Sequence, residues 1–203
     1  MNDLPMSRSR AQKLARWLKS NYGPRLTAAL SPTPFSIDIA CAIVCKETGI
    51  YLVDFIESMT PVTALARCVF DASGDAPGTS RRAFPVNAAA FRAAFGDGFT
   101  DQLIDEANKT REARGMGPAR YLYKGYGLFQ YDLQHVKSDE IFFRNKLWSD
   151  FDQCLSRLVR ELTTKFARTE ELWAAIQAYN GSGPAAVVYR THVQQLTEFC
   201  AAT

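Results

Sequence analysis

The sequence lacks the features that mark membrane-spanning, fibrous and disordered chains. No stretch approaches the roughly 20 consecutive apolar residues of a transmembrane helix. The first ten residues have no apolar core of the kind found in a secretory signal peptide, and the 203 residues contain no internal repeat. Hydrophobic residues make up 47% and charged residues 22% of the chain, fractions that exclude a disordered segment, a collagen-like fibre and a coiled coil. An ordinary globular protein is therefore expected.

Metal-binding and disulfide patterns are also scarce. The five cysteines include no C-x-x-C pair, and the two histidines stand alone in the sequence. An odd cysteine count without such pairs is typical of neither a disulfide scaffold nor a zinc site. Cys41 and Cys45 lie four positions apart in an apolar run, which predicts two small buried residues on one helix face. No metal and no cofactor are predicted.

The charge is nearly balanced, with a net value of +3. Residues 1–30 carry six basic side chains against one acid. This segment is interpreted mainly as the solvated face of a helix, with contact to an anionic polymer as the alternative. Because no helix-turn-helix or zinc pattern accompanies it, nucleic acid is not an expected partner.

The hydrophobic periodicity predicts a mainly α-helical fold. The clearest amphipathic stripe covers residues 149–167, and Ser36 is a plausible N-cap for a buried helix over residues 36–47. A short extended segment is expected near residues 120–132. Further helices are expected over these ranges: 10–20 (basic, and ended by Asn21-Tyr-Gly-Pro), 61–70 (with Pro61 first), 87–95, 100–114, 169–180 and 184–200.

Glu47 stands out because it closes the apolar run of the buried helix, in Cys45-Lys-Glu47-Thr48-Gly49. The partial negative charge of a helix C-terminus and apolar surroundings both favour the neutral carboxylic acid. A protonated acid is what a glycosidase needs to protonate its leaving oxygen. The alternative is a surface residue, paired with Lys46, at the point where the helix ends.

Two further short patterns follow along the chain. Gly125-Tyr-Gly127-Leu128-Phe129-Gln130-Tyr131-Asp132 is glycine-rich and ends in an amide and an acid. Glycines permit close backbone approach to a ligand, although a structural turn explains them equally well. Ala178-Tyr179-Asn180-Gly181 reads as a helix C-terminus with Gly181 in the left-handed conformation. That explanation does not require Tyr179 or Asn180.

Taken in this order, the three patterns resemble the superfamily of goose-type lysozymes and soluble lytic transglycosylases. Members carry a catalytic Glu followed by a small hydroxyl residue, then Gly-Leu-Met-Gln, then Ala-Tyr-Asn-Ala-Gly. The corresponding residues here are Glu47-Thr48, Gly127-Leu128-Phe129-Gln130 and Ala178-Tyr179-Asn180-Gly181. The resemblance implies a single lysozyme-like domain over residues 1–203, with a basic N-terminal helix at about 10–20.

The sequence departs from the family pattern at three points. Phe129 replaces Met, and Thr48 stands where lytic transglycosylases prefer Ser. Glu47 and Gln130 lie 83 positions apart, a much longer interval than the family shows. An inserted helical lobe over about 71–118 accounts for this interval. The lobe is expected to form a lid or wall of the substrate site, or to carry a second acid.

The resemblance implies cleavage of the β-1,4 bond between N-acetylmuramic acid and N-acetylglucosamine in peptidoglycan, with Glu47 as the acid. In a hydrolase an acidic side chain positions the attacking water. In a lytic transglycosylase the 6-hydroxyl of the muramic acid attacks, and a 1,6-anhydro sugar forms. Asp132 lies two residues after Gln130, where goose-type lysozymes carry an aspartate, so hydrolysis is slightly favoured. The alternative is that Asp132 caps a turn.

The resemblance also implies a substrate-binding set: Thr48, Tyr126, Gln130, Tyr179 and Asn180. Because no signal peptide is visible and the substrate lies in the cell wall or periplasm, delivery is expected through phage lysis, a secretion machine or a longer polypeptide. A toxin of this kind would require an immunity or inhibitor protein. A non-catalytic glycan-binding or structural module of a phage or secretion apparatus remains an alternative function.

Overall fold

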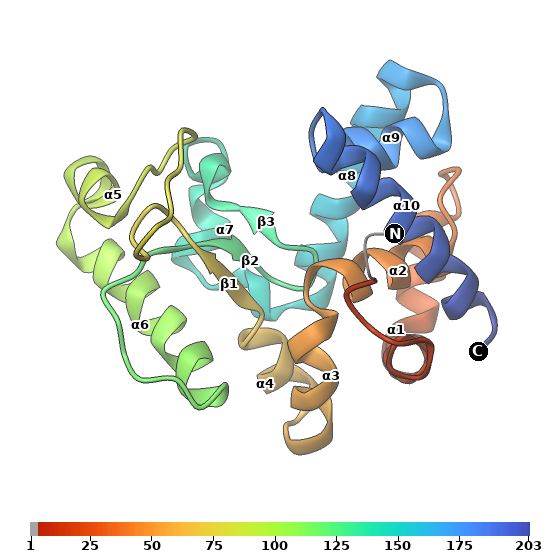
Figure 1. The fold of residues 1–203 in the computed structure, drawn as a ribbon, viewed down its shortest axis with the longest axis horizontal. Coiled ribbons are helices and arrows are strands. Elements are labelled where there is room, and N and C mark those ends of the chain that lie inside the picture. Colours follow the sequence, from red (N-terminus) through yellow and green to blue (C-terminus); the bar gives the residue numbers. More distant parts are fainter. Residues whose placement is uncertain (1–3) are drawn as a thin grey trace. The chain divides into compact units, whose positions relative to one another are not determined.

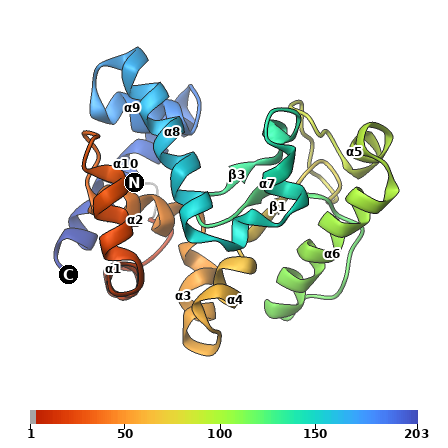
Figure 2. The same cartoon turned by 180° about the vertical axis from the view of Figure 1, so that it is seen from behind.

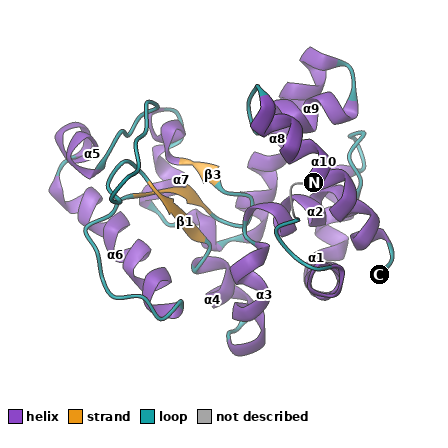
Figure 3. Ribbon diagram, in the orientation of Figure 1, coloured by secondary structure: helices purple, strands orange, loops and turns teal. Residues whose placement is uncertain are grey.

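The computed structural model describes residues 4–203 and is mainly helical, with ten α-helices and one three-stranded sheet in that range (Figures 1 and 3). The chain forms two compact units. The first comprises the chain up to Glu57 together with Leu155–Thr203, and the second comprises Ser58–Cys154. The mainly α fold class is thus confirmed.

The first unit is built around a short apolar helix. Its elements are α1 (Arg8–Leu30), α2 (Ile37–Glu47), α3 (Gly49–Ser58), most of α8 (Phe151–Thr169), α9 (Leu172–Tyr179) and α10 (Pro184–Ala201). Seven consecutive residues of α2, from Ile39 to Cys45, are buried. Both α1 and α10 pack against α2 (Figure 2). A helix that is apolar on all sides requires such neighbours, so α2 forms the core of this unit.

Helix α1 is longer than the sequence predicts. It runs to Leu30 through Pro24 and does not end at Asn21-Tyr-Gly-Pro. Proline lacks the amide hydrogen that would bond to the preceding turn, and it disfavours a helix interior by about 3 kcal/mol. Tyr22, Leu26 and Leu30 recur every four residues and are all buried. Burial of these three side chains on one face offsets the proline and carries the helix through it.

The basic residues of α1 form ion pairs within the first unit. Arg10 pairs with Asp54 at 3.0 Å, and Lys13 pairs with Glu57. The Lys19 ammonium lies 2.8 Å from Asp38. These pairs join α1 to α3 and α2, which accounts for much of the positive charge at the start of the sequence.

The second unit combines a small antiparallel sheet with short helices. Its elements are α4 (Pro61–Ala66), β1 (Val69–Ala72), α5 (Ala88–Phe95), α6 (Asp97–Ala113), β2 (Tyr123–Tyr126), β3 (Tyr131–Asp132), α7 (Glu140–Arg144) and the 3₁₀ helices η1 (Leu133–Lys137) and η2 (Leu147–Ser149). The strand order is β1-β2-β3. The hairpin of β2 and β3 is the extended segment expected near residues 120–132.

The second unit includes more of the chain than the lobe expected at 71–118, because strand pairing draws in residues on both sides of that segment. Val69 pairs with Tyr126 and Ala72 with Tyr123, so β1 and β2 join the two ends of the intervening segment. Helix α4 begins at Pro61 as predicted but ends at Ala66. The chain beyond it enters β1, in which Val69 and Phe70 are buried. A four-residue strand carries too little sequence pattern to be separated from the preceding helix.

Candidate functional site

Helix α2 delivers Glu47 to the end of a buried segment. The helix starts where the Ser36 hydroxyl accepts a hydrogen bond from the Ile39 amide at 3.2 Å, the predicted N-cap. Glu47 is its last residue, and its side chain is half-buried. The predicted position of this carboxylate at the end of an apolar helix is therefore confirmed.

Tyr189 of α10 holds the Glu47 carboxylate. Its hydroxyl donates a hydrogen bond to Glu47 Oε1 at 2.6 Å, and the side chain is 3% exposed. The pKa of Tyr189 is raised well above its ordinary value of 10. Burial is the largest cause, and the nearby Glu47 and Tyr179 side chains add to it. The phenol therefore stays protonated at neutral pH and acts as a hydrogen-bond donor.

Tyr179 belongs to the same cluster. Its ring centroid lies 6.2 Å from that of Tyr189, and it is the last residue of α9. The Lys46 ammonium lies 5.9 Å from the centroid of the Tyr189 ring. Tyr189 thus brings together Glu47 and Tyr179, which are more than 130 positions apart in sequence.

Asn180 and Thr48 occupy different environments. Asn180 is exposed, and its backbone caps α9. Thr48 has no exposed surface, and its hydroxyl donates to the Val44 carbonyl at 3.3 Å. The sequence suggested Thr48 as a sugar contact, but in the structure it closes the C-terminal turn of α2, because its hydroxyl can satisfy a helix-end carbonyl.

Gln130, in the second unit, holds a tight turn between β2 and β3. Its side-chain amide donates to the Gly127 carbonyl at 2.9 Å and to the Cys68 carbonyl at 3.3 Å. Gly127 has a φ of 77°, and a β-carbon at Gly125 would overlap the Gln130 side chain. The glycine-rich pattern therefore has a structural reason. Gln130 Oε1 is buried and has no hydrogen-bond partner among the residues that the structure describes.

Asp132 caps a helix and pairs with an arginine. Its Oδ1 accepts a hydrogen bond from the Gln134 amide at 2.7 Å, at the start of η1. Arg81 donates to both carboxylate oxygens, at 2.5 and 3.1 Å. Both oxygens of this carboxylate are thus engaged by hydrogen bonds from the protein itself. This arrangement corresponds to the turn-cap alternative and does not favour the water-positioning role.

Tyr126 is a core residue. Its side chain has no exposed surface, and its ring packs edge-on against Phe143 and Trp148 at centroid distances of 5.3 and 4.9 Å. Its expected role in sugar binding is not supported, because a sugar would have to displace these rings. Thr48, Tyr179, Asn180 and Glu47 belong to the first unit, whereas Tyr126, Gln130 and Asp132 belong to the second.

Tyr189 is the site residue that sequence reasoning missed. It lies on α10 among apolar residues and belongs to none of the three short patterns. In sequence it cannot be distinguished from a core tyrosine. Its function as a donor to Glu47 depends on the packing of α10 against α2, which only the tertiary structure provides.

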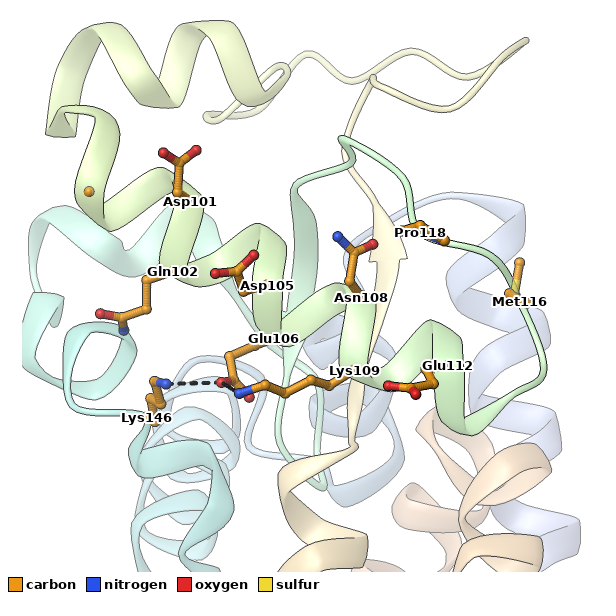
Figure 4. Close-up of a pocket in the computed structure, with 11 residues that line it drawn as sticks. Asp101, Gln102, Asp105, Glu106, Asn108, Lys109, Glu112, Met116, Pro118 and Lys146 are labelled. Carbon is orange, nitrogen blue, oxygen red and sulfur yellow. Dashed lines mark hydrogen bonds and ion pairs between the residues drawn. The ribbon is translucent and has the colours of Figure 1, made fainter.

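A hollow of about 730 Å³ lies along α6 in the second unit (Figure 4). Glu106 on its wall is 5% exposed and binds Arg67, Lys109 and Lys146 at 2.7 to 3.1 Å. Burial opposes ionisation, but the hydrogen bonds from Lys109 and Lys146 outweigh it and lower the pKa of Glu106 below 4.5. Because this carboxylate stays ionised at neutral pH, it is unsuited to be a general acid.

The other reactive groups give no second centre in the described residues. All five cysteines are buried and reduced. Burial raises the pKa of Cys41 and of Cys68, which keeps both as unreactive thiols. Residues 4–203 contain no cluster of three or more His, Cys, Asp or Glu side chains arranged to hold a metal ion.

Comparison with known proteins found no matching family, no matching curated protein and no matching solved structure. Within residues 4–203, none of the helices combines the length and the apolar character needed to cross a membrane. Any functional assignment therefore depends on the site itself.

Proposed function

We propose that the protein cleaves the β-1,4 glycosidic bond between N-acetylmuramic acid and N-acetylglucosamine in peptidoglycan, with Glu47 as the general acid. The observation that carries this proposal is the hydrogen bond from Tyr189 to Glu47 at the end of the buried helix α2. It is supported by the order of the three patterns that resemble goose-type lysozymes and lytic transglycosylases.

In this mechanism Glu47 donates a proton to the glycosidic oxygen as the bond to the leaving sugar breaks. The Tyr189 hydroxyl holds the carboxyl group in one orientation for proton transfer to the substrate. Tyr179 packs beside Tyr189, and the exposed Asn180 amide follows it as a polar group for the sugar. Acid chemistry of this kind uses protein side chains alone.

The attacking group distinguishes the two reaction routes. Hydrolysis with inversion requires a second carboxylate to activate water, and Asp132 was the residue suggested for it. The hydrogen bonds of Asp132 to Arg81 and to the Gln134 amide at the start of η1 weaken that suggestion. Attack by the substrate's own 6-hydroxyl requires only Glu47, now acting as base. The lytic transglycosylase route is therefore the better supported of the two.

Analysis of muropeptides released from purified peptidoglycan tests the function and the route together. We expect products ending in 1,6-anhydro-muramic acid, lighter by one water than reducing products. Asp132→Asn should retain cleavage per folded molecule and destabilise the protein by about 2 kcal/mol, because charge-assisted hydrogen bonds to Arg81 are lost. Reducing products, together with loss of cleavage in Asp132→Asn, would instead establish Asp132 as the hydrolytic base.

Replacing Tyr189 by Phe should lower the rate of cleavage tenfold to a hundredfold, because Glu47 loses the group that orients it. The ring is retained, so the effect on the free energy of unfolding should be about 1 kcal/mol. The expected change is in kcat, with KM nearly constant. Tyr121→Phe is the matched control, since its hydroxyl donates no hydrogen bond within residues 4–203. Equal activity of the two variants would contradict the positioning role.

A further inference from the structure

A second hollow, of about 510 Å³, lies in the second unit beside the loop between β1 and α5. Its lining comes from the end of β1, this loop and β2: Asp71, Ala72, Ser73, Ala76, Thr79, Ser80, Arg81 and Lys124. These residues lie outside the three patterns that suggested glycan cleavage, apart from the contact between Arg81 and Asp132.

The loop is held in one conformation by partly buried polar contacts. The Asp75 carboxylate accepts hydrogen bonds from the Ala88 and Leu122 amides, at 3.0 to 3.1 Å. Arg81 bonds to Asp132 and also to the Phe84 carbonyl at 3.2 Å. A pocket wall that is fixed before binding loses little conformational entropy when a ligand enters. The hollow is thus preorganised.

Two residues of the pocket wall each carry a buried polar atom that has no hydrogen-bond partner within residues 4–203. The two atoms are Ser73 Oγ, on a side chain that is 2% exposed, and Arg81 Nε. Leaving a buried polar group unsatisfied is unfavourable. The Arg81 Nε–H group can only donate, and the Ser73 hydroxyl can donate as well. Each of these two donors is therefore matched in chemistry by an acceptor oxygen.

The pocket also contains one cation and one anion without ion-pair partners in residues 4–203. The pairing of Phe70 with Gly125 and of Ala72 with Tyr123 places Asp71 of β1 opposite Lys124 of β2. Among the described residues, neither the Asp71 nor the Lys124 side chain forms a salt bridge or a hydrogen bond. The charge of Arg81, by contrast, is balanced by Asp132. The pocket therefore offers one unmatched charge of each sign beside unsatisfied donors.

This combination selects the chemistry of the ligand. A phosphate dianion would be repelled by Asp71, and only one unpaired cation, Lys124, would offset its two negative charges. A neutral sugar would leave both charges unmatched. A carboxylate and an ammonium on the same carbon satisfy the donors and both charges. We propose that this pocket binds the free amino-acid end of a ligand, with its carboxylate at Ser73, Arg81 and Lys124 and its ammonium at Asp71.

A diamino acid in the peptide stem of peptidoglycan carries such a free end. This choice of source depends on the proposed function, whereas the ligand chemistry depends only on the pocket. On this reading, the segment that separates Glu47 from Gln130 in sequence contributes a recognition site for the stem peptide.

Titration of the full chain carrying Glu47→Gln, followed by NMR, tests the ligand chemistry without cleavage. Meso-diaminopimelate should bind, and pimelate, which has the same carbon chain without amino groups, should bind at least tenfold more weakly. Asp71→Asn should reduce the difference in affinity between diaminopimelate and pimelate, because the variant lacks the carboxylate that pairs with the ligand ammonium. Equal affinities for the two acids, or tighter binding of inorganic phosphate than of diaminopimelate, would overturn the proposal.

Substitutions in the pocket wall test whether diaminopimelate binds in this pocket. Ser73→Ala and Lys124→Met should each weaken diaminopimelate binding about fivefold to tenfold. Ser73→Ala should not lower the melting temperature, because its hydroxyl has no hydrogen-bond partner in the described part of the chain. Arg82→Gln removes a neighbouring exposed charge that does not line the pocket. If Arg82→Gln weakens binding as much as Lys124→Met, general electrostatic attraction accounts for the effect and the site is refuted.

Competition identifies the source of the ligand. A muropeptide with a diaminopimelate-containing stem should displace free diaminopimelate from the Glu47→Gln protein. Failure to compete would restrict the pocket to free amino acids and refute the wall-derived source, with no consequence for cleavage by Glu47. Conversely, persistent cleavage by Glu47→Gln would refute the proposed catalytic acid while leaving the diaminopimelate titration as an independent result.

Discussion

Replacing Glu47 by Gln is expected to lower the rate of peptidoglycan cleavage by at least about a thousandfold, because the amide cannot donate a proton to the glycosidic oxygen. The fold should be retained. Gln presents an acceptor oxygen in nearly the same position, so the hydrogen bond from the Tyr189 hydroxyl persists. Solubilisation of purified peptidoglycan and thermal unfolding, measured on the same preparation, give the two readouts.

Glu57→Gln is the matched control for this experiment. Glu57 is an exposed carboxylate at the end of α3, in the same unit, and pairs with Lys13 of α1. The same chemical change there should leave cleavage unaltered and shift the free energy of unfolding by less than about 1 kcal/mol. Wild-type activity in folded Glu47→Gln protein would refute the assignment of the catalytic acid.

Replacing Glu106 by Gln should produce the largest loss of stability among the predicted variants, about 3 kcal/mol. The wild-type carboxylate is 5% exposed and satisfies three cations, of which Arg67 is itself mostly buried. Removing the negative charge leaves these cations facing one another in a poorly solvated region. Denaturant unfolding of the second unit measures the effect. Glu112→Gln, an exposed position on the same helix, should be nearly neutral.

The same carboxylate predicts a pH dependence with a defined sign. Because the folded protein lowers the pKa of Glu106 below 4.5, the unfolded chain binds its proton more tightly. The stabilising contribution is therefore complete above the ordinary glutamate pKa and is lost as the pH falls through the lowered value. The difference in stability between wild type and Glu106→Gln should shrink in that acidic window. A difference independent of pH would contradict the ion cluster as its cause.

Local sequence was sufficient to predict much of the helical structure. Ser36 as an N-cap and the uninterrupted apolar run behind it gave the boundaries of α2, and with them the place of Glu47. Residues 151–169 form one amphipathic helix, close to the predicted range of 149–167. These predictions succeed because capping and periodicity act over a few residues. Helix α1 exceeded its prediction because burial at Tyr22, Leu26 and Leu30 outweighs a local signal, the proline.

The roles of the candidate site residues depended on contacts between segments that are distant in sequence, much more than the helices did. Glycines 125 and 127 were recognised from the sequence, but only the structure shows that they make room for Gln130 and Cys154. Asp132 looked equally suited to catalysis and to capping a turn, and its pairing with Arg81, 51 positions earlier, supports the second interpretation. A composition pattern cannot tell a sugar-facing tyrosine from a core tyrosine, as Tyr126 illustrates.

By itself, the sequence determined the mainly helical fold class and the placement of an acid at the end of a buried helix, because both follow from interactions between near neighbours. The tertiary structure decided which groups surround each acid. It gave Glu47 a tyrosine donor from α10, Asp132 an arginine and Glu106 three cations. The chemical character of a carboxyl group is set by charges and donors within a few ångströms, and only the folded chain brings these together.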